Sequence, residues 1–279
     1  MADPITRRAF VKGAVGAAVF TGIAGGAGYS YWESGDLLIN EQTIPIKGLP
    51  EGFHGVRIAF LTDLHRGQFI SNEYVDQAVE RANSLKADMI LLGGDYVDYD
   101  ADLIVSVMER LGRLKAPLGV YAVLGNRDIR ANRMLSSLEL KRQGIPQITN
   151  RGVWIENHGS RIYLAGFDDV TIGHPDIPAG LSGATTDATI LALTHNPFLV
   201  DSIVDPRVRL ILCGHTHGGQ INLPVLGRPF IPQGCERYPI GLIQSPNAKV
   251  FVSAGIGVTY APIRFRCPPE VSLLTLARA

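Results

Sequence analysis

A short apolar segment that ends in a group of carboxylate, amide or imidazole side chains occurs five times in this sequence. In the last instance, the apolar residues Val208, Leu210, Ile211 and Leu212 are followed by Cys213 and the stretch 214–219, where one residue separates His215 from His217. Continuous apolar runs of this length are typical of buried strands in parallel sheets. Because ligands of open α/β sheets bind beyond the carboxyl ends of the strands, the recurring pattern predicts an α/β fold with a polar site at one edge.

The five groups consist of residue types that bind metal ions. A single group is weak evidence, because an aspartate after a strand often caps a helix and two histidines in a turn can be ordinary loop residues. Five groups after five strands are not explained by caps, and such oxygen and nitrogen ligands suit a pair of Mn, Fe or Zn ions. The groups are Asp63-Leu64-His65, Gly94-Asp95-Tyr96-Val97-Asp98, Gly125-Asn126-Arg127-Asp128, His195-Asn196 and Gly214-His215-Thr216-His217.

The composition is that of an ordinary folded protein. Of 279 residues, 46% are hydrophobic, and 26 basic side chains balance 26 acidic ones. The net charge of zero argues against nucleic acid as the main partner, so no nucleic-acid binding is expected. The three cysteines form no disulfide framework, and Cys213 is expected to be a small core residue.

The N-terminal residues have the pattern of a targeting segment. Residues 6–12 contain a hydroxyl residue, two adjacent arginines, a phenylalanine and a lysine in the order of a twin-arginine export signal, and residues 13–28 carry no charge. We therefore expect residues 1–30 to be a twin-arginine signal or membrane anchor and residues 31–279 to form one folded domain. A short amphipathic or buried helix is the alternative.

This signal predicts that the twin-arginine export machinery carries the protein across the cytoplasmic membrane. No clean A-x-A cleavage site follows the uncharged run. The expected location is therefore the periplasm, the cell wall or, if the signal is retained as an anchor, the outer face of that membrane.

Hydrophobic periodicity predicts alternating strands and helices in the first half of the chain and mostly strands in the second. Residues 222–247 are rich in proline and glycine and are expected to form a long loop, which in a compact domain is usually functional or mobile. The predicted helices span residues 72–86, 102–114, 131–143 and 198–204, and the predicted strands span residues 37–46, 56–61, 89–92, 118–124, 153–156, 161–166, 189–193, 208–212, 249–254 and 271–277.

In their order, the five groups resemble the motifs of the calcineurin-like metallophosphoesterases, which read D-x-H, G-D-x-x-D, G-N-H-D, a lone His and G-H-x-H. The resemblance extends over residues 56–277, and the signal makes the chain similar to the exported bacterial phosphodiesterase branch. It implies a four-layer αββα sandwich that holds two divalent metal ions. By the family pattern, one ion takes Asp63, His65, Asp95 and His217, and the other takes Asp95, Asn126, His195 and His215.

The resemblance also implies hydrolysis of a phosphodiester or pyrophosphate bond without a protein nucleophile. Asp95 would bridge two ions about 3.5–4 Å apart, and a hydroxide that bridges the metals would attack phosphorus. We expect a phosphorylated substrate linked to a lipid or to the cell wall, and an uncleaved signal would bring membrane association.

The third motif departs from the family pattern, because Arg127 stands where most members have histidine. Arginine has a pKa above about 12 and cannot donate a proton near neutral pH, although it can hold a phosphoryl oxygen with two parallel hydrogen bonds. The substrate is therefore expected to have a leaving group that needs little protonation. The G-N-R-D variant also resembles UDP-2,3-diacylglucosamine pyrophosphatases of lipid A synthesis, although the export signal argues against that cytoplasmic substrate. A metal-binding protein with little turnover is a further alternative.

Several polar residues are candidates for roles beyond metal binding. Asn126 and Arg127 are the predicted catalytic residues, and Arg127, Asn196 and Arg228 are the predicted substrate contacts. Arg228 lies in the long loop, where an arginine side chain could bind an anionic substrate.

Two carboxylates and two further arginines are assigned weaker roles. Asp98 and Asp128 are expected to orient the site or form turns rather than bind metal. Arg264 and Arg266, beside an aromatic residue, are candidates for the rim of the substrate site.

Overall fold

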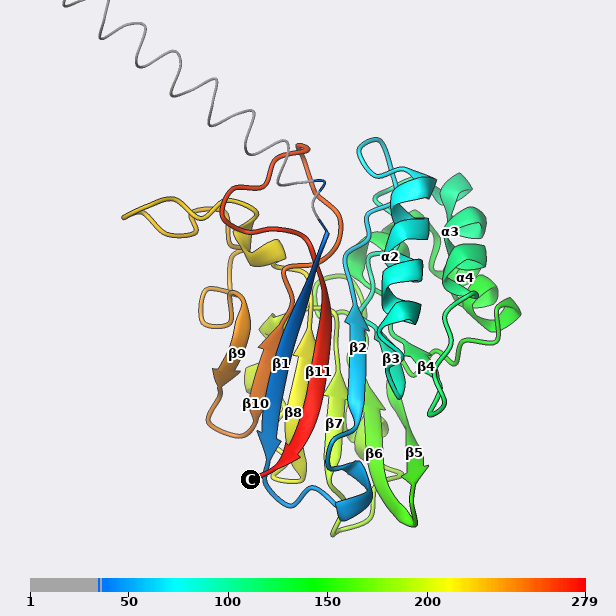
Figure 1. Cartoon of the computed structure of the whole chain (residues 1–279), viewed down its shortest axis with the longest axis vertical. Coiled ribbons are helices and arrows are strands. Elements are labelled where there is room, and N and C mark those ends of the chain that lie inside the picture. Colours follow the sequence, from blue (N-terminus) through cyan, green and yellow to red (C-terminus); the bar gives the residue numbers. More distant parts are fainter. Residues whose placement is uncertain (1–34, 36) are drawn as a thin grey trace, which may run out of the picture.

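The computed structural model describes residue 35 and residues 37–279, so the predicted signal or anchor at residues 1–30 lies outside the described residues. The described chain forms two β-sheets that pack face to face, with helices over the outer face of the first sheet (Figure 1). Within the described part of the chain, no helix combines the length and the apolar character needed to cross a membrane.

The first sheet contains five strands in the order β1-β11-β2-β3-β4. The strands β2, β3 and β4 run parallel, and the helices α2 and α3 form the connections between them. The C-terminal strand β11 is antiparallel to β2 and parallel to β1. The elements are β1 (Leu38–Ile46), β11 (Glu270–Arg278), β2 (Arg57–Leu61), β3 (Met89–Leu92), β4 (Val120–Ala122), α2 (Asn72–Ser84), α3 (Ile104–Leu111) and α4 (Asn126–Arg142).

The second sheet contains six strands in the order β5-β6-β7-β8-β10-β9. Its four central strands are parallel, and its two edge strands, β5 and β9, pair antiparallel with their neighbours. A short helix, α5, and a 3-10 helix, η3, belong to its outer layer. The elements are β5 (Arg151–Asn157), β6 (Ser160–Gly166), β7 (Ile190–Leu193), β8 (Val208–Cys213), β10 (Lys249–Val252), β9 (Gly241–Gln244), α5 (Ile177–Leu181) and η3 (Pro197–Ser202).

Three apolar clusters hold these layers together. Between the sheets, Phe60 and Leu91 of the first sheet belong to one buried cluster with Leu212 of the second. A second cluster joins the three long helices to the outer face of the first sheet, and a third lies under α5 and η3. Each fully buried side chain of this kind contributes about 1.5–3 kcal/mol. The predicted αββα sandwich is therefore confirmed, with a thin outer layer on the second sheet.

The predicted elements match the observed ones where the apolar pattern is continuous. Strand β3 has the predicted bounds, and α2 begins after Ser71, whose side chain accepts a hydrogen bond from the backbone N–H of Tyr74. The predicted helix at residues 198–204 is the 3-10 helix η3, which starts at Pro197. Cys213 is a buried core residue as expected, and burial raises the pKa of its thiol well above the ordinary value.

Helix α4 begins at Asn126, earlier than the predicted residue 131. It consists of two helical segments that meet at a kink at Asn132, where φ is −171° and ψ is 94°. The side-chain oxygen of Asn132 accepts a hydrogen bond from the backbone N–H of Leu135, which caps the second segment. The G-N-R-D motif therefore forms the first turn of a helix, a segment that the apolar pattern did not predict.

The prediction of an uninterrupted loop over residues 222–247 is wrong, because β9 lies inside it. Strand β9 pairs with β10 at the edge of the second sheet. Its four residues contain only two apolar side chains, Leu242 and Ile243. This pattern is too short to distinguish a strand from a loop.

Candidate metal centre and active site

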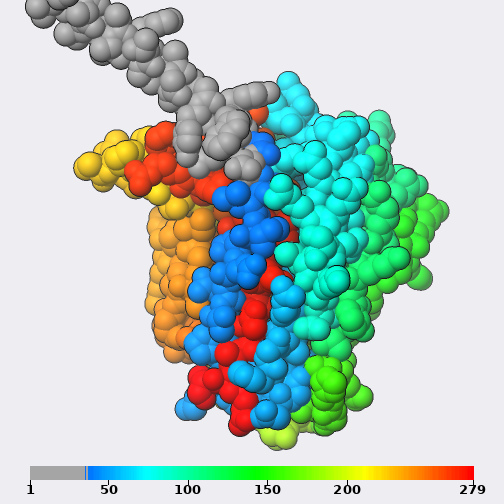
Figure 2. All heavy atoms as spheres, viewed as in Figure 1, coloured from blue at the N-terminus to red at the C-terminus, as the bar shows by residue number. Residues whose placement is uncertain are grey.

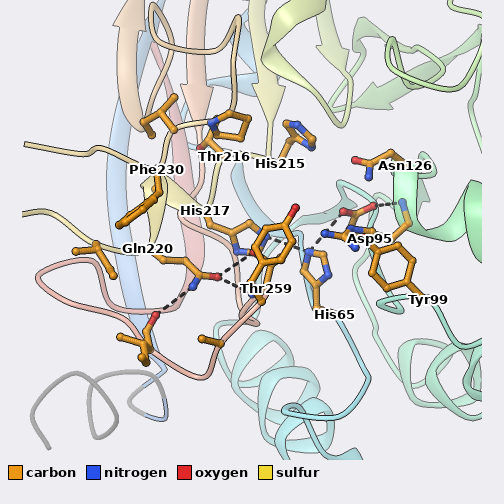
Figure 3. A pocket seen from close by; sticks show the side chains of 18 of the residues that line it. His65, Asp95, Tyr99, Asn126, His215, Thr216, His217, Gln220, Phe230 and Thr259 are labelled. Carbon is orange, nitrogen blue, oxygen red and sulfur yellow. Dashed lines mark hydrogen bonds and ion pairs between the residues drawn. The ribbon is translucent and has the colours of Figure 1, made fainter. Parts of the chain in front are cut away.

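The predicted ligand residues lie at one end of the sandwich, where β2, β3, β4, β7 and β8 end. Each follows its strand by a few residues, and Asn126 is the first residue of α4. Figure 3 shows the side chains of His65, Asp95, Asn126, His215 and His217 around one pocket, which they reach from several segments of the chain. The carboxyl ends of parallel strands thus bring together residues from both sheets, as the sequence predicts.

The backbone of these loops is unusual at the ligand positions themselves. Asp63, His65, Asp95, His215 and His217 all have φ between 49° and 68°, a region that residues other than glycine rarely adopt. Such conformations cost of order 1–3 kcal/mol each and persist only where the surrounding structure determines them. Five of them in one place are typical of a functional site.

The glycines of the motifs allow the loops to approach one another. A Cβ atom at Gly125 would lie 2.1 Å from the Oδ1 atom of Asp95, and one at Gly214 would lie 2.2 Å from the Oδ2 atom of Asp63. Any side chain at either position would therefore displace a predicted metal ligand. This explains why glycine precedes Asn126 and His215.

Asp63, His65 and His217 form the first cluster of candidate ligand atoms, and all three are buried. The Nε2 atoms of His217 and His65 are 3.0 Å apart, and the Oδ1 atom of Asp63 lies 3.5 Å from His217 Nε2 and 3.7 Å from His65 Nε2. The backbone N–H of His215 donates to the carboxylate of Asp63 and fixes its orientation.

Asp95, His195 and His215 form the second cluster. The Nε2 atom of His195 lies 3.3 Å from Asp95 Oδ2 and 3.2 Å from His215 Nδ1. The Nδ1 atom of His195 is 2.9 Å from the carbonyl oxygen of Gly93, so Nδ1 carries a proton and Nε2 faces the cluster. Loss of the Nε2 proton would give the tautomer that a metal ligand requires.

Asp95 lies between the two clusters. Its Oδ2 atom is 3.5 Å from His65 Nε2 in the first cluster and 3.3 Å from His195 Nε2 in the second. Its Oδ1 atom accepts the backbone N–H of Arg127 at 2.8 Å. One carboxylate therefore faces both groups of ligands, which is the arrangement that a bridging role needs.

The titration behaviour of the site reflects many ionisable groups buried together. Burial alone would raise the pKa of Asp63, but His217 and the other imidazoles lower it overall, and His195 likewise lowers the pKa of Asp95 against burial. Burial alone would lower the pKa values of His65 and His195. The neighbouring carboxylates outweigh burial and raise these pKa values to about 9 for His65 and about 10 for His195. The buried carboxylates therefore require positive charge close by.

The remaining two imidazoles respond in the opposite direction. Burial and the neighbouring His195 lower the pKa of His215 to about 4, and burial lowers the pKa of His217 well below its ordinary value. The lowered pKa values favour the neutral form of both side chains, and a neutral imidazole has the lone pair that a metal ligand needs.

These residues fit a pair of divalent cations. The Oδ1 atom of Asn126 is buried and has no hydrogen-bond partner among the described residues, although a buried amide oxygen normally has one. A cation in the second cluster would provide that partner. Imidazole nitrogen, carboxylate oxygen and amide oxygen together suit Mn, Fe or Zn.

Asp128 positions the loop that carries Asp95. Its carboxylate accepts the backbone N–H groups of Asp95, Tyr96, Gly125 and Val97 at distances of 2.8–3.3 Å. Burial and the charge of Asp95 raise its pKa to about 7, against the effect of these donors. It does not belong to either ligand cluster, so the structure agrees with its predicted orienting role.

Arg127 lines the pocket beside the second cluster. The centre of its guanidinium group lies 4.0 Å from the ring centroid of Tyr99 and 5.6 Å from that of Tyr260. Its Nη1 atom is 3.3 Å from Asp98 Oδ1, which also lies 3.5 Å from His65 Nδ1. Asp98 therefore sits between a candidate ligand and Arg127, rather than among the ligands.

The pocket itself has a volume of about 610 Å³ and two kinds of wall. Asn126 and Tyr99 lie on one side, whereas Phe230 lies on the opposite side (Figure 3). The guanidinium group of Arg127 stacks on Tyr99, and Arg130 follows Asn126 by one turn of α4. The apolar side is completed by residues of two loops that follow the second sheet, namely Ile221, Ile231, Pro232, Tyr260, Ala261 and Ile263. A cationic side and an apolar side would accommodate an anionic group attached to an apolar one.

Two predicted substrate contacts do not line this pocket. Asn196 is buried, and its side chain binds Thr171 and caps η3 at Phe198. The guanidinium group of Arg228 donates to the carbonyl oxygen of Gly218 and lies 3.2 Å from Cys267 Sγ. Both side chains hold loops in place, and the structure does not bring them to the cavity.

Arg264 also differs from its expected place on the rim. It is fully buried, and its guanidinium group donates to backbone carbonyl oxygens that include those of Ala254 and Gly257. Its Nη2 atom lies 3.4 Å from His217 Nδ1. Sequence reasoning instead missed Tyr99, Tyr260 and Arg130, because no motif marks aromatic or basic residues in these loops as pocket residues.

A sandwich of two mixed sheets with two adjacent clusters of histidine and carboxylate ligands at the carboxyl ends of its strands defines a metal-dependent hydrolase. The calcineurin-like phosphoesterase family model matches residues 56–219, and the chain belongs to this family. Members of the family typically depend on a pair of metal ions, and the structure has two candidate groups for them.

Two bacterial relatives match nearly the whole chain. YkuE of Bacillus subtilis (strain 168), described as an uncharacterized metallophosphoesterase, is 31% identical over 280 residues, covering 98% of each chain. The phosphodiesterase YaeI of Escherichia coli (strain K12) is 33% identical over 279 residues, covering 98% of this chain and 99% of YaeI. The protein is therefore a metal-dependent phosphoesterase.

Among solved structures, NAD nucleotidase (NadN) of Haemophilus influenzae shares the fold. The TM-score is 0.50 and the identity 14%, over 72% of this chain and 45% of the nucleotidase. At this identity the likeness concerns the fold alone.

Proposed function

We propose that this phosphoesterase is an exported enzyme that hydrolyses a phosphodiester or pyrophosphate bond whose leaving group needs little protonation. The observation that carries the proposal is Arg127, which takes the place of the family's histidine and is held at the pocket by Tyr99 and Asp98. The seven candidate ligands would hold two divalent ions, namely Asp63, His65, Asp95, Asn126, His195, His215 and His217.

The residues of the chain have separate tasks in this proposal. When bound, the two ions would lower the pKa of a water molecule to yield a hydroxide nucleophile and would neutralise the phosphate oxygens. Arg127 binds a phosphoryl oxygen through the N–H groups that Asp98 leaves available. Asn126, whose amide oxygen has no hydrogen-bond partner among the described residues, would help to hold the second ion.

The described residues of the pocket include no imidazole that is free to donate a proton to the leaving group. The imidazoles that line it are those of His65, His215 and His217, and each belongs to a ligand cluster. A guanidinium group is not a general acid near neutral pH. This favours a leaving group that departs as a stable anion, such as a phosphate or an aryl oxide.

The proposed location rests on the sequence. The arrangement of residues 6–12 and the uncharged run 13–28 support recognition by the twin-arginine export machinery, and either removal of this segment or its retention as an anchor. The substrate would then be a phosphorylated molecule of the envelope, linked to a lipid or to the cell wall.

A UDP-2,3-diacylglucosamine pyrophosphatase-like activity is the second candidate. Two observations favour it, namely the G-N-R-D motif and the apolar side of the pocket. The export signal opposes it, because that substrate lies on the cytoplasmic side. The alternative of a binding protein without turnover is disfavoured by the 33% identity to a named phosphodiesterase over almost the whole chain.

A substrate comparison tests the leaving-group argument. The full-length enzyme, loaded with Mn²⁺, should hydrolyse bis-p-nitrophenyl phosphate and a nucleotide-sugar pyrophosphate much faster than a simple dialkyl phosphate. Arg127→His should raise the rate on the dialkyl phosphate relative to the other two, because imidazole can protonate an alkoxide. A parent enzyme that prefers the dialkyl phosphate would refute the proposal. Hydrolysis of the nucleotide sugar alone would favour the second candidate.

A further inference from the structure

Two loops form the outer edge of the pocket, and we call them the rim loops: residues 222–231 and residues 258–266. Backbone hydrogen bonds join their bases, because Asn222 N–H donates to the carbonyl oxygen of Phe265 and Phe265 N–H donates to that of Gln220. In Figure 2 the first rim loop (yellow) protrudes beside the second (red-orange) at one end of the molecule. The two loops therefore form one continuous surface.

The tips of the rim loops are apolar and exposed. The exposed fractions are 104% for Val225, 75% for Leu226 and 87% for Tyr260, and Phe230 and Ile263 between them and the pocket are also exposed. Single exposed apolar residues are common on proteins, but a group of them at the mouth of a cavity marks an interaction surface.

The fold holds the first tip in this position. Leu223 and Gly227 exchange two backbone hydrogen bonds, of 2.6 and 2.9 Å, across a tight turn. Val225 in this turn has φ of 71°, a strained conformation for a β-branched residue. A strained, closed turn with two exposed apolar side chains at its tip indicates a function, since neither side chain belongs to a hydrophobic cluster of the described residues.

The charged residues within the rim loops have one sign. Neither rim loop contains an aspartate or a glutamate, whereas Arg228, Arg264 and Arg266 lie within them. Arg264 is buried, but Arg266 is exposed and Arg228 is half-buried near the base of the first loop. Arg130, at the pocket, adds a further exposed cation. Exposed apolar tips with flanking arginines complement an anionic lipid surface.

The continuous described chain begins at the same end of the molecule. The backbone N–H of Leu38, at the start of β1, donates to the carbonyl oxygen of Pro269 at 2.9 Å, and Leu38 pairs with Glu270. Both partners follow the second rim loop directly. The continuous described chain therefore begins beside the second rim loop, and the uncharged run of residues 13–28 precedes it in the sequence.

We propose that the rim loops are a membrane-docking surface, on which Val225, Leu226 and Tyr260 enter the interface of a bilayer that contains anionic lipid. The tips are convex and protrude from the surface, which suits insertion between lipid head groups better than capture of a peptide in a groove. Docking would turn the mouth of the pocket toward the head groups. The docking does not depend on catalysis, whereas a phosphodiester or pyrophosphate presented by the bilayer as substrate rests on the proposed function.

Tryptophan quenching tests the insertion directly. Leu226→Trp in the full-length protein is compared with Val204→Trp, because Val204 is also exposed, at 66%, but precedes β8 and so lies at the opposite end of the strands. The parent chain, with Trp32 and Trp154, is the blank. Vesicles of brominated phosphatidylcholine and phosphatidylglycerol should quench the tryptophan at position 226 and leave that at 204 unchanged. Equal quenching at both positions, or none at 226, would overturn the proposal.

The same experiment excludes other occupants of the surface. If residues 1–34 or a protein partner covered the tips instead, tryptophan at position 226 would not respond to brominated lipid, and the proposal would fail. Vesicles of phosphatidylcholine alone should quench it less, because the arginines then have no anionic lipid to bind.

A double variant measures the contribution to binding. Val225→Asp with Leu226→Asp should weaken sedimentation of the full-length protein with anionic vesicles by about tenfold or more, because two apolar side chains are lost and two negative charges gained. Hydrolysis of soluble bis-p-nitrophenyl phosphate should stay at the parent rate, since neither residue lines the pocket. Unchanged vesicle binding would refute docking. An inactive parent that still binds vesicles would refute the proposed function and leave docking intact.

Discussion

At the floor of the pocket, Asp63 and Asp95 follow buried strands within a few residues, and each accepts a backbone N–H from another ligand loop. At the mouth, Phe230 and Tyr260 extend from long loops, and both side chains are largely exposed. The floor is buried, charged and held by short connections, whereas the mouth is apolar and held mainly at the bases of its loops.

Because of this difference, we expect the floor to determine the rate of the chemical step and the mouth to determine which substrates bind. A ligand one or two residues beyond a strand has little freedom, so a substitution there should change the rate of the chemical step or the metal content. A residue on a long loop touches only the part of the substrate that remains outside the floor. Substitutions at the mouth should therefore change KM for particular substrates and leave kcat nearly constant.

The largest effect is expected at the carboxylate shared by the two clusters. Asp95→Asn keeps the acceptor for Arg127 N–H but removes the negative charge that faces both His65 and His195. We expect loss of bound metal and a fall in kcat on the order of 10³-fold, similar to chelation of the parent enzyme. Metal analysis and steady-state kinetics measure both.

Asp205→Asn is the matched control for this prediction, because Asp205 pairs with Arg207 before the start of β8, at the opposite end of the strand from the site. It should keep the parent activity. An Asp95→Asn enzyme with full metal content and activity within about tenfold of the parent would contradict the bridging role. A loss of that size is typical of a residue that only orients a metal ligand.

A smaller effect on the floor is expected from Asp128→Asn. An amide offers one acceptor oxygen where the carboxylate accepts four backbone N–H groups, so the loop that carries Asp95 would lose part of its support. We expect metal affinity to fall by about 10–100-fold. Activity measured against metal concentration should be restored by excess Mn²⁺; an enzyme that excess metal does not restore would show that Asp128 has another role.

At the boundary between floor and mouth, Tyr99 and Tyr260 should differ in effect. Tyr99→Ala removes the ring 4.0 Å from the guanidinium group of Arg127 and should raise KM by about tenfold, whereas Tyr260→Ala, at 5.6 Å, should raise it by about twofold. Tyr99→Phe should behave like the parent, because the ring face and not the hydroxyl meets Arg127. Equal effects of the two alanine variants would argue against stacking as the reason.

The smallest effect is expected at the mouth. Phe230→Ala should raise KM by about fivefold for a diester that carries an acyl or aryl group, because the side chain offers apolar area on one side of the pocket. For a small polar diester KM should be unchanged. A similar change for both substrates would mean that Phe230 shapes the floor rather than the mouth.

The same contrast explains what could be predicted from the sequence. The structure brings the seven predicted ligand residues to one end of the sandwich, because each follows an apolar run whose length and composition predict a buried strand. Gly125 and Gly214 lie beside these ligands because a Cβ atom at either position would collide with the carboxylate of Asp95 or Asp63. Short-range patterns thus predicted the floor.

The mouth could not be predicted in this way. Arg228 and Asn196 have residue types suited to substrate binding, yet both side chains are used in contacts between loops that lie far apart in sequence. Tyr99 and Tyr260 have no motif, and only the packing of the loops brings them to Arg127. Residue type alone does not determine whether the side chain of a loop residue lies in the pocket.

Each ligand cluster contains residues from both sheets. Asp63 and His65 follow β2 of the first sheet and meet His217 from the loop after β8 of the second, while Asp95 follows β3 and meets His195 and His215. Neither half of the chain offers a complete set for an ion. Two metal ions bound to the purified protein would therefore indicate that the two sheets are packed against each other as in the native fold. Metal content could thus serve as an assay of correct folding.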